Sequence, residues 1–97
     1  MNDPIPLSRA LVASARSSLL AFLRIELGIA NTMLDGVAAS SDEAARSRRR
    51  DRATQACNEV VRFLEIDSAR SGLSLADRAE LNAGLYAVRE RLVDAGA

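Results

Sequence analysis

The 97-residue chain contains no histidine, lysine or tryptophan, and it has only one cysteine and two prolines. Without histidine it cannot form a histidine phosphotransfer bundle, a Ser-His-Asp or Cys-His nucleophile pair, or a metal site with a histidine ligand. The single cysteine, Cys57, excludes a disulfide within the chain and fits a reducing compartment. These absences argue against catalysis, so the sequence predicts a protein that is not an enzyme and needs no cofactor or metal.

Bulky apolar residues are also few for the length of the chain. The aromatic residues are Phe22, Phe63 and Tyr86, and alanine supplies much of the 48% apolar content. Alanine buries little surface, so we expect a thin core of the kind that self-assembly often supplements.

The charges balance, because the chain has thirteen arginines and thirteen acidic residues, and the formal net charge is zero. A neutral chain is not typical of a protein whose main role is to bind phosphate backbones. The use of arginine alone among the basic residues is best explained by a GC-rich genome, as in a small bacterial-type protein, because the arginines are scattered.

The N-terminal region lacks the features of a targeting segment. It has no basic stretch before its first apolar run, and that run, residues 17–23, is interrupted at once by Arg24 and Glu26. No uncharged segment reaches the length of a transmembrane helix. We therefore expect a soluble cytoplasmic protein without membrane contact.

Local signals divide the chain into three helices and no strands, at about residues 4–35, 41–69 and 75–95. Gly36 is expected to end the first helix, and Ser71-Gly72 to break the second. The start signals are Asp3 for the first helix, Ser40 with Glu43 in capping-box spacing for the second, and Ser74 for the third.

Short loops make successive helices antiparallel, so the prediction is a single all-α domain over residues 1–97, a three-helix up-down-up bundle. It can be described as a long helical hairpin plus a third helix. The third helix is clearly amphipathic, because its apolar residues recur at spacings of four, three and four: Leu81, Leu85, Val88 and Leu92.

The first helix has more apolar surface than a surface helix needs. At 100° per residue its apolar arc spans about 220°, against the 100° or so that one buried stripe requires. The arc divides into two seams. One contains Leu11, Ala15, Ser18, Phe22, Ile25 and Ile29; the other contains Leu20, Leu23, Leu27, Ala30, Leu34 and Val37.

The second of these seams is predicted to be the surface through which two copies of the chain dimerise. Residues 38–59 offer one buried-type side chain larger than alanine, Cys57, so they lack the bulk to cover this seam. An exposed strip through Leu20, Leu27 and Leu34 would form an apolar patch typical of a protein–protein interface, most simply with a second copy of the chain. The alternative is that the first helix is central and both seams are internal.

Two charged features have both a structural and a functional interpretation. An arginine cluster, Arg46, Arg48, Arg49, Arg50 and Arg52, is interspersed with acids and fits a solvated surface with local ion pairs. Its alternative role is contact with nucleic acid. Glu26 lies within the apolar arc, where it either pairs with an arginine or, duplicated in a dimer, forms a carboxylate metal site.

These patterns predict a small, non-catalytic, self-associating helical module for protein–protein interaction, either an adaptor or an inhibitor or regulator of a protein partner. The alternative is a nucleic-acid-associated regulator that uses the arginine cluster.

Overall fold

The computed structural model describes the backbone of residues 4–70 and 72–96 and the side chains of residues 11–66 and 72–96. Its regular structure over these residues is helical, with α1 at Pro4–Ala39, α2 at Glu43–Arg70 and α3 at Leu75–Asp94. The prediction of an all-α helical bundle is confirmed.

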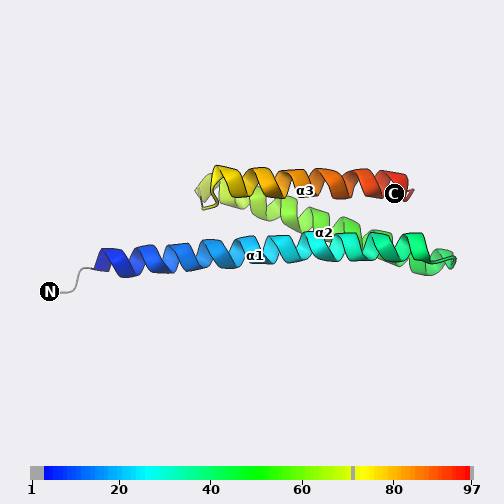
Figure 1. Ribbon diagram of the computed structural model, residues 1–97, viewed down its shortest axis with the longest axis horizontal. Coiled ribbons are helices and arrows are strands. Elements are labelled where there is room, and N and C mark those ends of the chain that lie inside the picture. The colour runs from blue at the N-terminus through cyan, green and yellow to red at the C-terminus, as the bar shows by residue number, and fades with distance from the viewer. Residues whose placement is uncertain (1–3, 71, 97) are drawn as a thin grey trace.

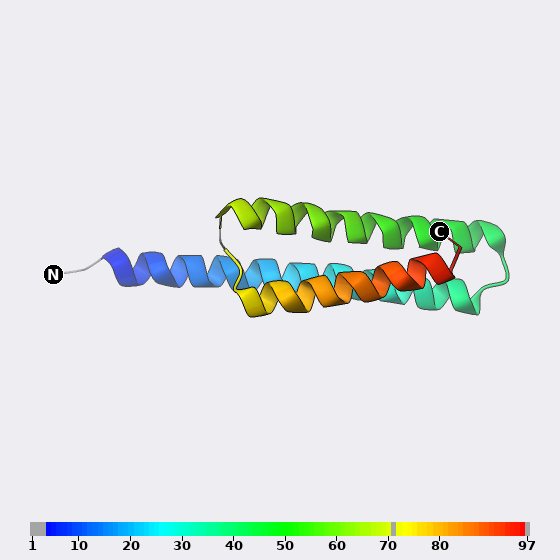
Figure 2. The same cartoon turned by 90° about the horizontal axis from the view of Figure 1, so that it is seen from above.

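The helices lie side by side in an elongated bundle. Figures 1 and 2 show α2 folding back along α1, and α3 folding back along α2. The N-terminal part of α1 projects beyond the ends of the other two helices in both views. The molecule measures 66 × 18 × 17 Å, and its radius of gyration is 16.9 Å. A compact domain of about 100 residues has a radius of gyration near 13 Å, so this shape is far from spherical.

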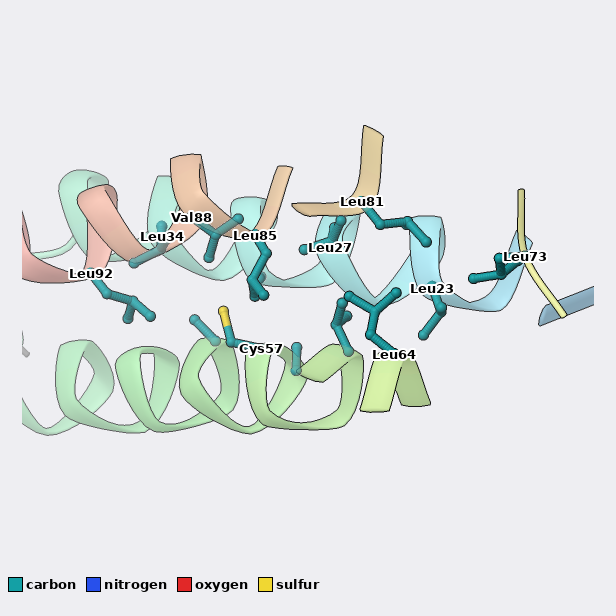
Figure 3. Packing of buried hydrophobic residues seen from close by; sticks show 14 residues of the cluster. Leu23, Leu27, Leu34, Cys57, Leu64, Leu73, Leu81, Leu85, Val88 and Leu92 are labelled. Atoms are coloured by element: carbon teal, nitrogen blue, oxygen red, sulfur yellow. The ribbon is translucent and has the colours of Figure 1, made fainter. Parts of the chain in front are cut away.

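The core is a single row of apolar side chains between the three helices (Figure 3). α1 and α3 contribute mainly leucines, whereas α2 contributes mostly smaller side chains. The buried members are Leu23, Leu27, Ala30, Leu34, Ala53, Ala56, Cys57, Val60, Leu64, Leu73, Leu81, Leu85, Val88 and Leu92.

Small residues bring the helices close together. Ala53 and Ala56 of α2 are fully buried against the neighbouring helices. A Cβ atom added at Gly84 of α3 would lie 2.9 Å from Cδ1 of Leu27, so α3 approaches α1 too closely for a side chain there. The large leucines of α1 are thus covered on one side by the mostly small side chains of α2, which lies close to α1, and on the other by the leucines of α3.

The ends of α1 and α2 differ from the sequence-based expectation. α1 runs through Gly36 to Ala39, so this glycine does not end it. A Cβ atom at Gly36 would lie 2.9 Å from Cδ of Arg49, and the glycine instead makes room for that side chain. α2 begins at Glu43, where Asp42 and not Ser40 accepts a hydrogen bond from the Ala44 amide, at 3.2 Å.

α3 starts at a side-chain cap. The Ser74 hydroxyl accepts a hydrogen bond from the Asp77 amide at 3.0 Å, which satisfies one of the free amides of the first turn. The buried face of α3 then faces the other two helices through its leucines and Val88.

A matched pair of leucines on α3 tests this core. Leu81 is 0% exposed and Leu75 is 86% exposed. Leu81→Ala should lower the free energy of unfolding by about 2–4 kcal/mol, because it removes buried methyl groups and leaves a cavity. Leu75→Ala should change it by less than about 0.5 kcal/mol. Urea unfolding followed by circular dichroism measures both, and equal losses would contradict this packing.

Candidate functional site

The seam predicted to be the dimer surface lies inside the chain. Its members are all buried except Leu20, which is half-buried: Leu23, Leu27, Ala30, Leu34 and Val37 have at most 9% of their surface exposed. This prediction is therefore corrected, because side chains in the core of one copy cannot contact another. The reason is the close approach of the alanine-rich face of α2, which covers leucines without bulky residues of its own.

The other seam of α1 faces outward. Leu11, Ala15, Ser18, Phe22 and Ile25 are exposed, and Ile29 is half-buried. Ile25 is 61% exposed, which is unusual for so apolar a residue in the middle of a long helix. Phe22 packs edge-to-face on Phe63 of α2, with ring centroids 5.4 Å apart, and so marks the border between this surface and α2.

The most outward positions of α1 form a regular pattern of their own. They follow alternating spacings of three and four, and Phe22 and Ile29 flank them. We call these residues together the outer face of α1: Leu11, Ser14, Ser18, Ala21, Phe22, Ile25, Gly28, Ile29 and Thr32. The outer face carries no charge, although the solvent-facing side of a helix is normally charged or strongly polar.

Two charged residues of α1 beside the outer face pair with α3. The Arg24 guanidinium donates two hydrogen bonds to the Glu80 carboxylate, at 2.7 and 2.8 Å. The Arg91 guanidinium donates to the Asp35 carboxylate at 2.7 Å. Both pairs turn α1 charges toward its own bundle and away from the outer face.

Glu26 turns toward α2. It is 8% exposed, and its carboxylate lies 3.8 Å from the Arg52 guanidinium. A buried carboxylate needs such a partner, because desolvation of an unpaired charge is unfavourable. Within the described ranges, no group of three or more histidine, cysteine, aspartate or glutamate side chains is placed to hold a metal ion.

Gly28 differs from the other glycines inside the helices. Side chains at Gly36 and Gly84 would collide with Arg49 and Leu27, whereas a Cβ atom at Gly28 would meet nothing within 4 Å. Glycine in the middle of a helix is less stable than alanine by about 1 kcal/mol. The fold of a single chain gives no packing reason for glycine at this position.

The accessible surface of the chain is larger than that of a typical folded monomer of the same mass. Its accessible surface is 6417 Å² for 10.4 kDa. The size scaling of folded monomers gives about 5,400 Å² at this mass, so the excess is about 1,000 Å². The elongated shape and the projecting end of α1 account for it (Figure 1).

Two members of the arginine cluster bind the C-terminal end of α1. The Arg46 guanidinium donates to the carbonyl oxygens of Val37, at 2.9 Å, and Ser40, at 3.1 Å. The Arg49 guanidinium donates to the Gly36 carbonyl oxygen at 3.0 Å. The last carbonyls of a helix lack partners within the helix, so these arginines act as caps supplied by the neighbouring helix.

The remaining arginines of the cluster either make contacts within the chain or are exposed to solvent. Arg50 donates to the Ala95 carbonyl oxygen at 3.2 Å, just beyond α3, and pairs with Glu43. Arg52 pairs with Glu26, and Arg48 is exposed. With four of five arginines engaged inside the chain, the cluster does not present a basic stripe, which weakens the nucleic-acid alternative.

Cys57 is in the core. It is 3% exposed, and burial raises the pKa of its thiol, an effect that Arg89 only partly opposes. A thiol with a raised pKa is a poor nucleophile, which fits an inert packing role.

Among the described residues, depressions lie between the helices at two places considered as binding sites. One, of about 260 Å³, is at the end of the bundle near Val37 and Arg91, and the other, of about 300 Å³, is between Leu64 and Arg89. Both fall at or below the lower end of the volumes typical of small-molecule sites.

One segment among the described residues, Leu11–Ala39, is long and apolar enough to cross a membrane by length and composition alone. Core helices of soluble proteins and N-terminal signal sequences share these properties, so the finding does not decide between a membrane and a soluble location.

Searches of protein-family models, of curated proteins and of solved structures found no match to this chain.

The capping role of the arginine cluster can be tested with two neighbours in it. Arg49→Ala should lower the free energy of unfolding by about 1 kcal/mol, because the Gly36 carbonyl loses its hydrogen bond. Arg48→Ala should change it by less than about 0.5 kcal/mol, since Arg48 is exposed. Thermal and urea unfolding measure the two effects; a loss in Arg48→Ala that equals that in Arg49→Ala would contradict the assignment.

The link between α1 and α3 predicts a dependence of stability on pH. The Arg24 hydrogen bonds hold the pKa of Glu80 below its ordinary value. The folded state then binds the Glu80 proton less tightly than the unfolded chain does. The pairing therefore stabilises the fold above the ordinary glutamate pKa, and this contribution disappears as the pH falls through the lowered folded pKa.

The measurement is carboxyl-detected NMR titration of Glu80. In Arg24→Gln the pKa of Glu80 should rise toward the ordinary value, whereas Arg62→Gln, on the exposed surface of α2, should leave it unchanged. A Glu80 pKa that does not respond to loss of Arg24 would show that the ion pair is not formed in solution.

Proposed function

We propose that the protein is a non-catalytic helical interaction module of the cytoplasm, an up-down-up bundle that self-associates through the outer face of α1. The observation that carries this proposal is the outer face itself: an uncharged, partly apolar helix surface, with Ile25 61% exposed, beside which Arg24 and Asp35 of α1 pair with α3.

Burial of this surface would supply the free energy of association. Full burial of a leucine, isoleucine or phenylalanine side chain contributes about 1.5–3 kcal/mol. Leu11, Phe22 and Ile25 are all exposed in the single chain and lie on the same side of α1. An exposed apolar strip of this kind on a soluble protein marks an interaction surface.

The surface fits a protein better than a lipid bilayer. Helices that lie on membranes usually carry unpaired basic residues beside the apolar face, where they meet anionic headgroups. Here Arg24, which lies beside the outer face, is bound in a bidentate pair with Glu80. The module would therefore act as an adaptor, or as an inhibitor or regulator of a protein partner, through helical surfaces rather than a pocket.

The proposal predicts that one charge in the outer face dissociates the assembly. Ile25→Asp should convert a dimer into a monomer of 10.4 kDa at micromolar concentration, because it buries an unpaired carboxylate in the contact. The matched control is Tyr86→Asp on α3, which replaces a residue 67% exposed and should leave the dimer intact. Size-exclusion chromatography with light scattering gives the masses.

Circular dichroism of both variants distinguishes dissociation from unfolding, since both should keep the helical spectrum of the parent. A parent protein that is monomeric across the micromolar range would overturn the proposal. So would a monomeric parent that sediments with phosphatidylcholine–phosphatidylglycerol vesicles, because the outer face would then serve a membrane.

A further inference from the structure

We propose that polar contacts on both flanks of the buried seam lock α1 in one rotational setting about its own axis, and that the same chain has a second setting in which the other seam is buried. The setting is a property of the single chain, so it does not depend on the self-association proposed above. Release of the lock would change which apolar surface α1 presents to solvent.

The two seams of α1 are similar enough in apolar content for either to line a core. The inner seam contains Leu23, Leu27, Ala30, Leu34 and Val37, and the outward seam contains Leu11, Ala15, Ser18, Phe22, Ile25 and Ile29. Burial of phenylalanine or isoleucine contributes about as much free energy as burial of leucine, so Phe22, Ile25 and Ile29 are able to replace the inner leucines. The seams are centred about 120° apart, and a turn of α1 through that angle exchanges them.

Polar contacts on one flank of the inner seam hold α1 against α3. The Arg24 guanidinium donates two hydrogen bonds to the Glu80 carboxylate, at 2.7 and 2.8 Å. The Arg91 guanidinium donates to the Asp35 carboxylate at 2.7 Å and to the side-chain oxygen of Asn31 at 2.9 Å. The α1 partners lie about 80–120° from the centre of the inner seam, so together they fix the angle at which α1 meets α3.

The opposite flank of the inner seam is held against α2. Glu26 lies about 60° from the centre of the seam on that side. It is 8% exposed, and its carboxylate is 3.8 Å from the Arg52 guanidinium. A carboxylate this deeply buried is unfavourable without a charged partner. With a contact on each flank, a turn of the helix in either direction has to stretch or break at least one of them.

A turn that buries the outward seam breaks these contacts on both flanks. It carries Arg24, Asn31 and Asp35 to the solvent side of α1, away from α3. It also moves Glu26 from the flank that faces α2 to the flank that faces α3. The chain is therefore unable to keep its polar contacts and bury Ile25 at the same time, which is why these contacts select the inner seam.

The packing of Leu27 beside Gly84 reports the setting directly. A Cβ atom added at Gly84 would lie 2.9 Å from Cδ1 of Leu27, so a methyl group of this leucine lies against the glycine backbone. A nuclear Overhauser cross-peak should therefore join the Leu27 methyl protons to the Gly84 α-protons. In the second setting this cross-peak disappears, and the methyl groups of Ile25 or Ile29 give cross-peaks to the buried Leu85 of α3.

The charges of the lock can be removed from α1 by a triple substitution, here called the lock variant: Arg24→Gln, Glu26→Gln and Asp35→Asn. A matched control makes the same changes at exposed positions of α2 and α3: Arg48→Gln, Asp51→Asn and Glu90→Gln. In the lock variant the cross-peak between Leu27 and Gly84 should fall about twofold or more, while the cross-peaks of the second setting appear. In the control it should keep the intensity of the parent protein.

Circular dichroism separates a change of setting from unfolding, because the lock variant should keep the helical spectrum of the parent. A lock variant with the parent cross-peaks at full intensity would overturn the proposal, since packing of the leucines would then be sufficient to fix the setting. Loss of the cross-peak together with the helical spectrum would overturn it too, because the contacts would then only add stability.

A charge swap tests one contact of the lock by a smaller change. Arg24→Glu alone places a second carboxylate opposite Glu80 and should weaken the cross-peak between Leu27 and Gly84. Addition of Glu80→Arg restores an ion pair with its charges exchanged, so the cross-peak should return to the parent intensity. A double variant that resembles Arg24→Glu would show that this pair does not position α1. A monomeric parent would overturn the proposed self-association and leave these expectations unchanged.

Discussion

The close packing of α1 on the small-residue face of α2 determines the rest of the structure. Ala53 and Ala56 let α2 lie near enough to cover the leucines of α1, and Gly84 does the same for α3. Because the seam from Leu23 to Val37 is buried in this way, most of the outer face of α1 is left exposed among the described residues. The candidate interaction surface is thus a consequence of how the core is built.

The ion pairs and hydrogen bonds of α1 also lie on the side of the helix that faces α2 and α3. The charged residues Arg24, Glu26 and Asp35 of α1 pair with α2 or α3. Arg46 and Arg49 reach back from α2 to the carbonyls at the end of α1. These contacts fix the helices relative to one another at both ends of the bundle, and they remove charge from the outward side of α1.

The features that depend on local periodicity could be predicted from the sequence alone. The spacing of Leu81, Leu85, Val88 and Leu92 predicted the buried face of α3, because a regular apolar stripe needs no knowledge of its partner. The all-α class followed from the same kind of signal. The buried seam of α1 could not be chosen in this way, since both of its seams have the right period and the choice depends on how near α2 lies.

Features that depend on distance between helices were missed. Alanines in α2 were judged too small to cover leucines, although small residues allow the approach that covers them. The arginines that cap α1 resembled a surface cluster, because a carbonyl acceptor on another helix has no sequence signature. Gly28 and Ser14 belong to the outer face of α1 but to neither predicted seam, because they are not bulky. The sequence signal that identifies them as members of this face is the lack of charge on the outward side of the helix.

The projecting end of α1 has a consequence for local stability. From Leu11 to Ser18 every side chain is exposed, so these two turns receive little tertiary support from the described residues of α2 and α3. Short helical stretches without such support are marginal in water. Opening of these turns therefore needs far less free energy than opening of the core, and amide hydrogen exchange there would be fast in a dilute sample. If two chains associate as proposed, docking would slow that exchange, and the order of this segment would then depend on protein concentration.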